Sequence, residues 1–521
     1  MKRRTFLQAS SMAAVPVLIN GIPVNAVARN SFLDFVSPDN DKILVLIQMS
    51  GGNDGLNMVL PIDQYSNLDK HRNKILIKES FGIKLRDGLA LHPSMTGVKS
   101  LYDNGGLKLI QSVGYPNQNR SHFRSTDIWT SGSSAEQFEV TGWLGRFYME
   151  NHASYPSGYP NADNPDPLAI TIGSLVSQTC QGKVANFSLA INDPSTLGLL
   201  PEGALAANLP SNTNYANELR YIVSTLLQTN DYSEVIKQAN TNAGGSIPAS
   251  GNALLDRLNI VAQLIKGGLK TKVYVVNIGG FDTHANQCDP DDHEIGTQAD
   301  LLKQLSDAMA GFQDQMSKAG FGKKVIGMTF SEFGRRIKAN DSTGTDHGTA
   351  APLFVFGECI DGGILGNNPT INDTVTNDEG VAMQYDFRSI YASLLIDWFE
   401  VSPSVVSQML FKDFQKLPII SGSCLSTGIE DVNRDFALRL DNYPNPALDY
   451  TIIHFETKNE FIRMSLFDSI GSELKVLFSG KINEGAHQIR LDTSELPVGN
   501  YVIRISNDQA QKTKILSKFE R

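Results

Sequence analysis

Carboxylates and imidazoles gather among glycines in two parts of this chain of 521 residues. One part is Gly279-Gly280-Phe281-Asp282-Thr283-His284. The other is Ser331-Glu332-Phe333-Gly334-Arg335, followed closely by Gly344-Thr345-Asp346-His347-Gly348. Apolar runs that are typical of buried strands, at 273–278 and 325–330, precede Asp282 and Glu332. Acidic and imidazole side chains at strand exits are the groups that a metal site on an open α/β sheet requires.

The elements that must position these side chains can be predicted from apolar periodicity. The continuous apolar run Ile43–Met49 ends in Ser50-Gly51-Gly52-Asn53-Asp54-Gly55, which is typical of a central parallel strand followed by a tight turn. Further strands are predicted at 107–113, 168–172 and 352–356, and helices at 203–240, 252–268, 296–318 and 387–400. This alternation predicts an α/β domain with a mostly parallel central sheet covered on both faces. Residues 130–210, rich in Gly, Pro, Ser and Asn, are predicted to be an insertion or long loops over the sheet edge.

In a parallel sheet the carboxyl ends of the strands share one edge, where ligands bind. Six side chains of metal-ligand type are therefore expected to converge there: Asp54, Asp282, His284, Glu332, Asp346 and His347. Carboxylates with imidazoles favour one or two divalent ions, such as Zn, Mn, Mg or Ca. Each residue alone has a simpler interpretation. Asp54 suits a turn, Asp282 suits a helix cap, and Glu332 could pair with Arg335 or Arg336.

The same motifs carry a resemblance to a known family. The stretches quoted above, together with Arg120-Ser121-His122-Phe123, resemble the exported family called domain of unknown function 1501, within the alkaline phosphatase and sulfatase superfamily. The resemblance covers residues 41–420 and implies a three-layer alkaline-phosphatase-like domain. It also implies two metals and a hydroxyl nucleophile at the start of a helix.

Ser121 is the first candidate for that nucleophile, because it precedes a predicted helix. Arg120 or Arg124 would then hold a phosphoryl oxygen. Ser121 could equally be an ordinary helix cap, and Ser125 is the second candidate nucleophile. His122 and Asp127 are either further ligands or structural residues.

The chain also departs from the superfamily pattern. Asp282 and His284 are closer in sequence than is usual there, and Phe333 stands where the superfamily has a histidine ligand. The sulfatase nucleophile motif is absent. We therefore expect an exported metal-dependent hydrolase of phosphate or related anionic esters, free or linked to a polysaccharide. A one-metal site, or a secreted binding protein that keeps the fold without the reaction, remains the alternative.

Both ends of the chain carry export signals. Residues 1–28 combine Arg3-Arg4 and Phe6-Leu7 with a short apolar run and Ala26-Val27-Ala28, as in twin-arginine signal peptides. Residues 29–40 and 421–436 are predicted linkers. Residues 437–521 alternate short strands with turns, which predicts a small β-sandwich. Asn442-Tyr443-Pro444-Asn445-Pro446 and Leu496-Pro497-Val498-Gly499-Asn500-Tyr501 resemble the C-terminal sorting domain of the type IX secretion system. The expected route is through the periplasm to the cell surface or medium, with both secretion machineries as partners.

The net charge of −10 argues against a nucleic-acid-binding surface, which needs a basic stripe. Four cysteines occur, at 180, 288, 359 and 424, and their spacing matches no zinc or Cys-x-x-Cys motif. They could form disulfides in one of three pairings, or remain as small buried apolar residues.

Overall fold

A computed structural model describes residues 40–195, 197, 229–245, 248–425, 440–457, 460–468, 472–483, 485–507 and 511–519. It also gives the backbone of a short antiparallel pair, β1 (Val17–Ile19) and β2 (Ile22–Val24). The chain divides into two compact units, Met1–Leu425 and Ser426–Arg521. Most of the predicted signal peptide and of the helix predicted at 203–240 lies outside the described residues, and the described part of the latter includes a helix at 229–242.

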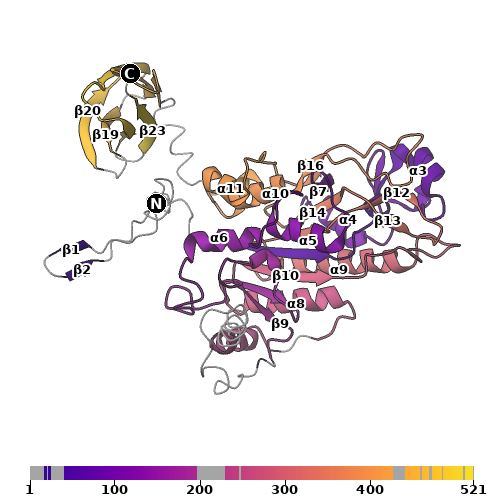
Figure 1. Cartoon of the computed structure of the whole chain (residues 1–521). Helices are drawn as coiled ribbons and strands as arrows, with labels where there is room; N and C mark the ends of the chain where they lie inside the picture. Colours follow the sequence, from indigo (N-terminus) through magenta and orange to yellow (C-terminus); the bar gives the residue numbers. More distant parts are fainter. Residues whose placement is uncertain are drawn as a thin grey trace, which may run out of the picture. The chain divides into compact units, whose positions relative to one another are not determined.

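A nine-stranded sheet forms the centre of the first unit (Figure 1). Its strands follow the order β15-β7-β14-β11-β3-β10-β8-β9, and β16 pairs with β7 outside that order. All neighbours are parallel except β14, which is antiparallel to both β7 and β11. The bounds are β3 Ile43–Met49, β7 Leu107–Gly114, β8 Ala169–Ile172, β9 Ser188–Ile191, β10 Val273–Ile278, β11 Val325–Phe330, β14 Ala351–Phe356, β15 Gly363–Leu365 and β16 Tyr385–Asp386.

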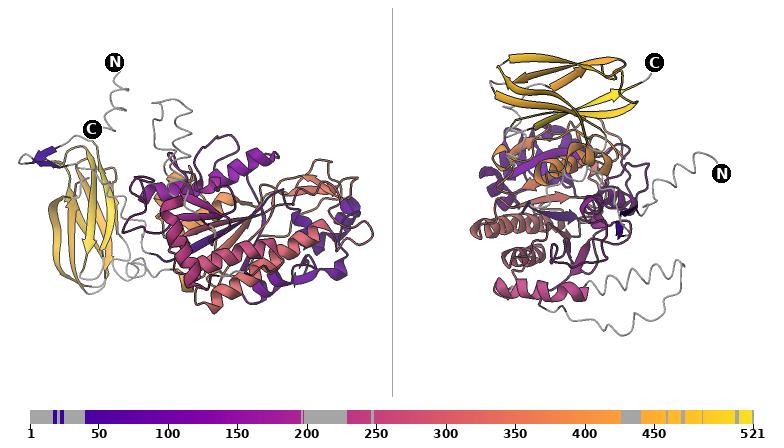
Figure 2. Two further views of the ribbon diagram at one scale, coloured as in Figure 1. Left: turned by 90° about the horizontal axis from the view of Figure 1, so that it is seen from below. Right: turned by 90° about the vertical axis from the view of Figure 1, so that its left-hand side faces the viewer.

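Helices cover both faces of this sheet, so the unit has three layers (Figures 1 and 2). On one face lie α4 (Thr96–Asp103), α8 (Ala253–Lys266) and α9 (Thr297–Lys318). On the other lie α5 (His122–Ser131), α6 (Trp143–Asn151), α10 (Phe387–Ser393) and α11 (Pro403–Met409), with the π-helical turn Leu394–Trp398 after α10. Along β3, Leu44 and Leu46 enter one core while Val45 and Ile47 enter the other. This is why the central strand is apolar at every position from Ile43 to Ile47.

The predicted α/β fold class is confirmed. The strand predicted at 168–172 is β8, and the rest of the region 130–210 is not only loops, because it also contains α6 and β9. Asp346 and His347 lie on a short strand, β13 (Thr345–His347). That strand forms an antiparallel pair with β12 (Arg335–Ala339).

The strand exits that carry the motifs lie side by side. Met49 at the end of β3 is in register with Ile278 at the end of β10, and Phe330 at the end of β11 is in register with Gln48. A small sheet follows β3 in the chain and has the strand order β4-β6-β5, with β4 Val59–Pro61, β5 Ile83–Arg86 and β6 Leu89–Leu91. Two helices lie in the same part of the chain, α2 (Gly55–Met58) and α3 (Tyr65–Arg72).

The second unit is a pair of antiparallel sheets around its own core, as predicted. One sheet has the order β17-β18-β21 and the other β20-β19-β22-β23. The bounds are β17 Leu440–Tyr443, β18 Tyr450–Thr457, β19 Glu460–Phe467, β20 Glu473–Ile482, β21 Gly485–Asp492, β22 Gly499–Ser506 and β23 Gln511–Lys518. Ile453, Ile462 and Leu516 are among its buried residues.

One disulfide joins Cys359 to Cys424, whereas Cys180 and Cys288 are buried free thiols. Both interpretations of the cysteines therefore apply, each to one pair. Among the described residues, no helix combines the length and the apolar character required to cross a membrane.

Candidate metal centre

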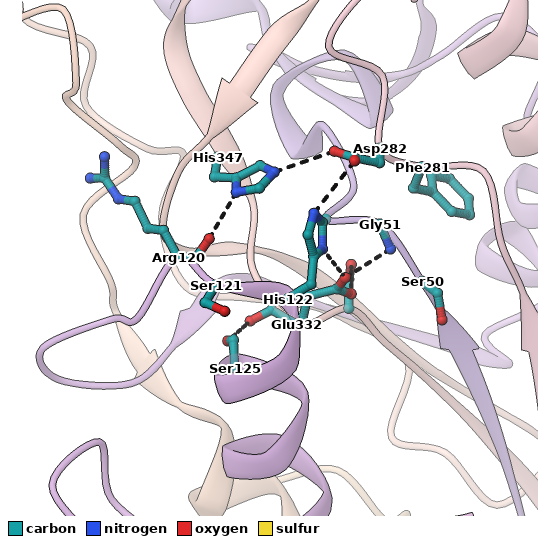
Figure 3. A network of polar contacts seen from close by, with 12 residues as sticks. Ser50, Gly51, Arg120, Ser121, His122, Ser125, Phe281, Asp282, Glu332 and His347 are labelled. Atoms are coloured by element: carbon teal, nitrogen blue, oxygen red, sulfur yellow. Dashed lines mark hydrogen bonds and ion pairs between the residues drawn. The ribbon is translucent and has the colours of Figure 1, made fainter.

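Three side chains from distant parts of the first unit meet at the carboxyl edge of the sheet (Figure 3). His122 begins α5, Asp282 follows β10, and His347 ends β13. One possible ligand atom from each lies within 4.8 Å of the others. These three residues form a group that could hold a metal ion.

His284 extends this group to four. Its Nε2 atom lies 2.9 Å from Nε2 of His347 and 3.2 Å from Oδ1 of Asp282. Oδ1 of Asp282 is 3.3 Å from Nε2 of His347, and Oδ2 is 3.5 Å from Nε2 of His122. Ligand atoms that bind one tetrahedral zinc ion at 2.0–2.1 Å lie about 3.3 Å from each other. The observed separations are close to that value.

The second ring nitrogen of each histidine is held by an acceptor. Nδ1 of His347 donates to the carbonyl oxygen of Arg120 at 2.8 Å. Nδ1 of His122 contacts Oε1 of Glu332 at 2.8 Å, and Nδ1 of His284 contacts Oδ1 of Asp346 at 2.9 Å. Because carbonyls and carboxylates only accept, each Nδ1 carries the proton and each neutral ring has its lone pair on Nε2.

The contact between the two Nε2 atoms therefore needs a cation. In their neutral forms His284 and His347 direct lone pairs at each other, which is repulsive unless a proton or a metal ion lies beside them. Nε2 of His122 is buried and has no hydrogen-bond partner among the described residues. A buried polar atom without a partner is costly, and a bound ion would satisfy it. The residues present thus fit a divalent metal.

Electrostatics keep the carboxylates charged and the imidazole neutral. Burial opposes ionisation of Asp282, but the hydrogen bond and charge of Arg335 outweigh it and lower the pKa of that carboxyl. Asp346 behaves similarly: burial opposes its ionisation, and hydrogen bonds from His284 and Asn340 lower its pKa. Burial lowers the pKa of His347. Metal ligation needs these protonation states.

Arg335 holds the surrounding loops together. Its buried guanidinium donates to the carbonyl oxygens of Gly51, Gly52, Phe281 and Thr345, and to Oδ1 of Asp282 at 2.7 Å. The glycines permit the close approach of these loops. A Cβ on Gly51, whose φ is +125°, would lie 2.3 Å from the backbone nitrogen of Asp282. A Cβ on Gly344 would lie 2.4 Å from the carbonyl oxygen of His284.

Three of the six predicted ligands lie outside the converging group. Glu332 and Asp346 contact the Nδ1 atoms of His122 and His284, on the side of each ring that faces away from the converging Nε2 atoms. Asp54 is buried and paired with Arg72 of α3, and it accepts a hydrogen bond from Gln287 at 2.7 Å. The structure therefore brings together Asp282, His284 and His347, and with them His122, which the sequence left as either a further ligand or a structural residue.

The candidate catalytic residues have different surroundings. Ser121 is exposed at the N-cap position of α5, and its hydroxyl does not cap the helix. Ser125 is fully buried and bonds to Glu332, Tyr115 and Gln118. Further along the same helix, Asp127 is not part of the metal group.

The two arginines that were predicted to hold a phosphoryl oxygen are engaged elsewhere. Arg124 donates to the carbonyl oxygens of Ser134, Ala135 and Gln137, and it lies 4.0 Å from the ring centre of Phe138. The side chain of Arg120 extends away from Asp282 and His122 (Figure 3), and its Nη1 atom donates to the carbonyl oxygen of Asp378 at 2.8 Å.

Comparisons with solved structures give distant similarities. A protein of the alkaline phosphatase superfamily from Vibrio parahaemolyticus is 11% identical, with a TM-score of 0.33, and the match covers 87% of this chain and 83% of that one. The sulfatase PsFucS1 from Pseudoalteromonas sp. is 10% identical, with a TM-score of 0.31 and coverages of 87% and 84%. PorZ, a surface component of the type IX secretion system of Porphyromonas gingivalis, is 12% identical over 19% of this chain and 13% of its own, with a TM-score of 0.13. At such scores these similarities say nothing about activity. No curated protein matches the chain.

Family comparisons are specific for both units. Residues 441–518 match the secretion system C-terminal sorting domain, which directs a protein through the type IX machinery to the cell surface or the medium. The family described as protein of unknown function DUF1501 matches residues 41–402. Since this match spans more than half of the chain, the protein belongs to the DUF1501 family.

Proposed function

We propose that this protein is an exported, metal-dependent hydrolase of phosphate or related anionic esters. The observation that carries the proposal is the cluster of His122, Asp282 and His347, with His284 in contact with the last two and with every Nδ1 atom held by an acceptor. His122, Asp282, His284 and His347 would hold a single divalent ion. Three nitrogen ligands and one carboxylate favour zinc or manganese over calcium and magnesium, which prefer oxygen.

The ion would supply charge that polarises an ester and lowers the pKa of a hydroxyl or water. The protein supplies the remaining features. Arg335 and the Nδ1 acceptors keep the proposed ligands in place, and the N-terminus of α5, which begins at His122, would favour an anionic ester. Ser121 is the proposed nucleophile because its hydroxyl is exposed, lies next to His122 in the chain and is not used as a cap.

Metal analysis of the purified full chain tests the site. We expect about one zinc or manganese ion per chain in the wild type, and loss of that ion in Asp282→Ala and His347→Ala. His454→Ala is the matched control, because His454 is an exposed histidine of the sorting domain. A wild-type protein that binds no divalent metal after incubation with zinc and manganese would contradict the proposal.

A second function, binding without catalysis, is favoured by one feature. The ring of Phe333 packs at 4.9 Å from the ring of His122 and at 4.6 Å from that of His347, and Asp54 is bound to Arg72. A second ion therefore lacks two of its expected ligands. Screening wild type and Ser121→Ala against phosphate monoesters, phosphate diesters and sulfate esters separates the two functions. Turnover that disappears in Ser121→Ala excludes the binding protein, and no turnover by metal-loaded wild type supports it.

A further inference from the structure

Arg120 and Arg336 lie beside His347, and their guanidinium groups are bound to the backbone of another loop. Nη1 of Arg120 donates to the carbonyl oxygen of Asp378 at 2.8 Å, and Nη1 of Arg336 donates to that of Asn377 at 3.3 Å. These carbonyls belong to consecutive residues of one loop. Both guanidinium groups are thus anchored at the same place on the rim of the candidate site.

The two cations lie close together, because the carbonyl oxygens that anchor them belong to consecutive residues. Within the described part of the chain, their one ion pair joins Arg336 to Asp346 at 3.5 Å. The Asp346 carboxylate is already engaged by His284 at 2.9 Å. The exposed carboxylate of Asp378 is a second, solvent-screened partner of both guanidinium groups. Two guanidinium groups whose carboxylate partners are engaged elsewhere or exposed would be stabilised further by an anion.

The backbone fixes where these charges lie. Arg336 forms an antiparallel bridge with Gly380, and the backbone nitrogen of Ile337 donates to the carbonyl oxygen of Glu379 at 3.0 Å. β12 is therefore joined to the chain directly after Asp378, next to the loop that anchors both guanidinium groups. The charged groups are held in place before any ligand arrives, which reduces the entropy that binding costs.

The same two residues contact His347, but on the side away from the metal group. Nδ1 of His347 donates to the carbonyl oxygen of Arg120, and Nε of Arg336 donates to the carbonyl oxygen of His347 at 3.4 Å. Figure 3 shows the Arg120 side chain extending away from Asp282 and His122. The two arginines are thus neighbours of the proposed metal site, but the side chain of Arg120 points away from it.

We propose that Arg120 and Arg336 form a second anion subsite, which binds a non-reacting phosphate, sulfate or carboxylate group of the substrate. This inference rests on the proposed function for the identity of the reacting ester, and it narrows the substrate class to esters with at least two anionic groups. Guanidinium groups suit such a ligand because they bind oxyanions through two parallel N–H donors.

Anion binding by the metal-free full chain tests the subsite without any catalysis. Inorganic sulfate is titrated calorimetrically into wild type, Arg336→Gln and Lys338→Gln. Lys338 lies on the same strand and bonds to the side chain of Asn377, so its variant removes the same charge nearby. We expect Arg336→Gln to weaken binding about tenfold or more and Lys338→Gln to change it less than about twofold. Equal losses in both variants, or none in Arg336→Gln, would overturn the subsite.

Turnover provides the second readout. A hexose monophosphate and a hexose bisphosphate are compared with metal-loaded protein. We expect kcat/KM for the bisphosphate to fall about tenfold more than that for the monophosphate in Arg336→Gln, with partial recovery in Arg336→Lys. Metal content and tryptophan fluorescence verify each variant, and Arg120→Gln replaces Arg336→Gln if the latter loses its metal.

The two proposals fail in different ways. If wild type hydrolyses neither ester while Arg336→Gln loses sulfate binding, the hydrolase proposal fails and the subsite stands. If wild type hydrolyses both esters and Arg336→Gln lowers them equally, the subsite is overturned and the hydrolase proposal stands.

Discussion

Oε1 of Glu332 lies 2.8 Å from Nδ1 of His122 and 2.8 Å from the backbone nitrogen of Gly51. One buried carboxylate oxygen thus connects the exit of β11, the start of α5 and the loop after β3. It directs the other nitrogen of His122 at Asp282. Glu332 therefore contributes to the centre by fixing the tautomer and orientation of a ligand.

Replacing Glu332 should weaken metal binding more than it harms the fold. We expect Glu332→Gln to reduce zinc or manganese affinity by about tenfold to a hundredfold, because the amide accepts the Nδ1–H proton less strongly than a carboxylate does. Competition with a chromogenic chelator measures the affinity. Glu150→Gln, at an exposed position on α6, is the matched control. Unchanged affinity in Glu332→Gln would show that His122 is oriented without it.

Substitution of the two candidate nucleophiles, Ser121 and Ser125, should affect different properties: turnover in one case and stability in the other. Ser121→Ala removes an exposed hydroxyl, so we expect turnover to fall by at least about a hundredfold and the free energy of unfolding to change by less than about 0.5 kcal/mol. Ser125→Ala removes the buried partner of Glu332, Tyr115 and Gln118 and should cost about 1–3 kcal/mol. Ester hydrolysis and urea unfolding measure the two effects. Normal turnover in Ser121→Ala with loss in Ser125→Ala would reverse the assignment.

The sheet was largely predictable because its central strands have a clear sequence signal. Continuous apolar runs such as 43–49, 273–278 and 325–330 can only be buried on both faces, and parallel order then places their polar exits together. The region 130–210 was harder, because α6 and the four-residue strand β9 lie among turn-forming residues. Short runs of that kind do not distinguish a sheet edge from a loop.

The ligand set was predictable only in part, because residue type does not reveal the partner. Asp54 has the chemistry of a ligand, but Arg72 from a helix 18 residues away neutralises it. Glu332 and Asp346 are as close in sequence to the centre as Asp282 and His347, yet each contacts only the Nδ1 side of an imidazole in the group. His122 was recognised as a residue of interest from its motif. Its role depends on the packing of α5 near β13, which brings the ring of His122 to 4.4 Å from that of His347. The spacing of residues along the sequence does not predict this tertiary contact.

Arg335 should be essential for the stability of the first unit, whereas the neighbouring Arg336 should not. Its side chain is fully buried and donates to four carbonyl oxygens and Asp282, so Arg335→Met leaves all five acceptors without that donor. We expect the free energy of unfolding to fall by about 3–5 kcal/mol. All three tryptophans, Trp129, Trp143 and Trp398, lie in the first unit, so their fluorescence during urea unfolding reports on that unit.

Arg336→Met is the control for that measurement. It lies on the same strand and makes side-chain contacts of 3.3 Å or longer, so its loss should cost less than about 1 kcal/mol. Similar destabilisation by both substitutions would mean that charge on β12, rather than the clamp formed by Arg335, stabilises the loops.

His92 should make the first unit sensitive to mild acid. It is buried after β6, its Nδ1 atom accepts from the backbone nitrogen of Ser94 at 3.1 Å, and burial lowers its pKa from 6.5 to about 4. Between these values the unfolded chain binds a proton that the folded chain does not. The contribution of His92 to stability is therefore fully present above pH 6.5 and decreases as the pH falls toward 4, by about 3 kcal/mol in total. Urea unfolding followed by fluorescence from pH 7 to 4.5 should show a smaller decrease in His92→Gln, whereas His454→Gln, at an exposed position in the sorting domain, should follow wild type. Identical pH dependence in His92→Gln and wild type would mean that other groups account for the acid sensitivity.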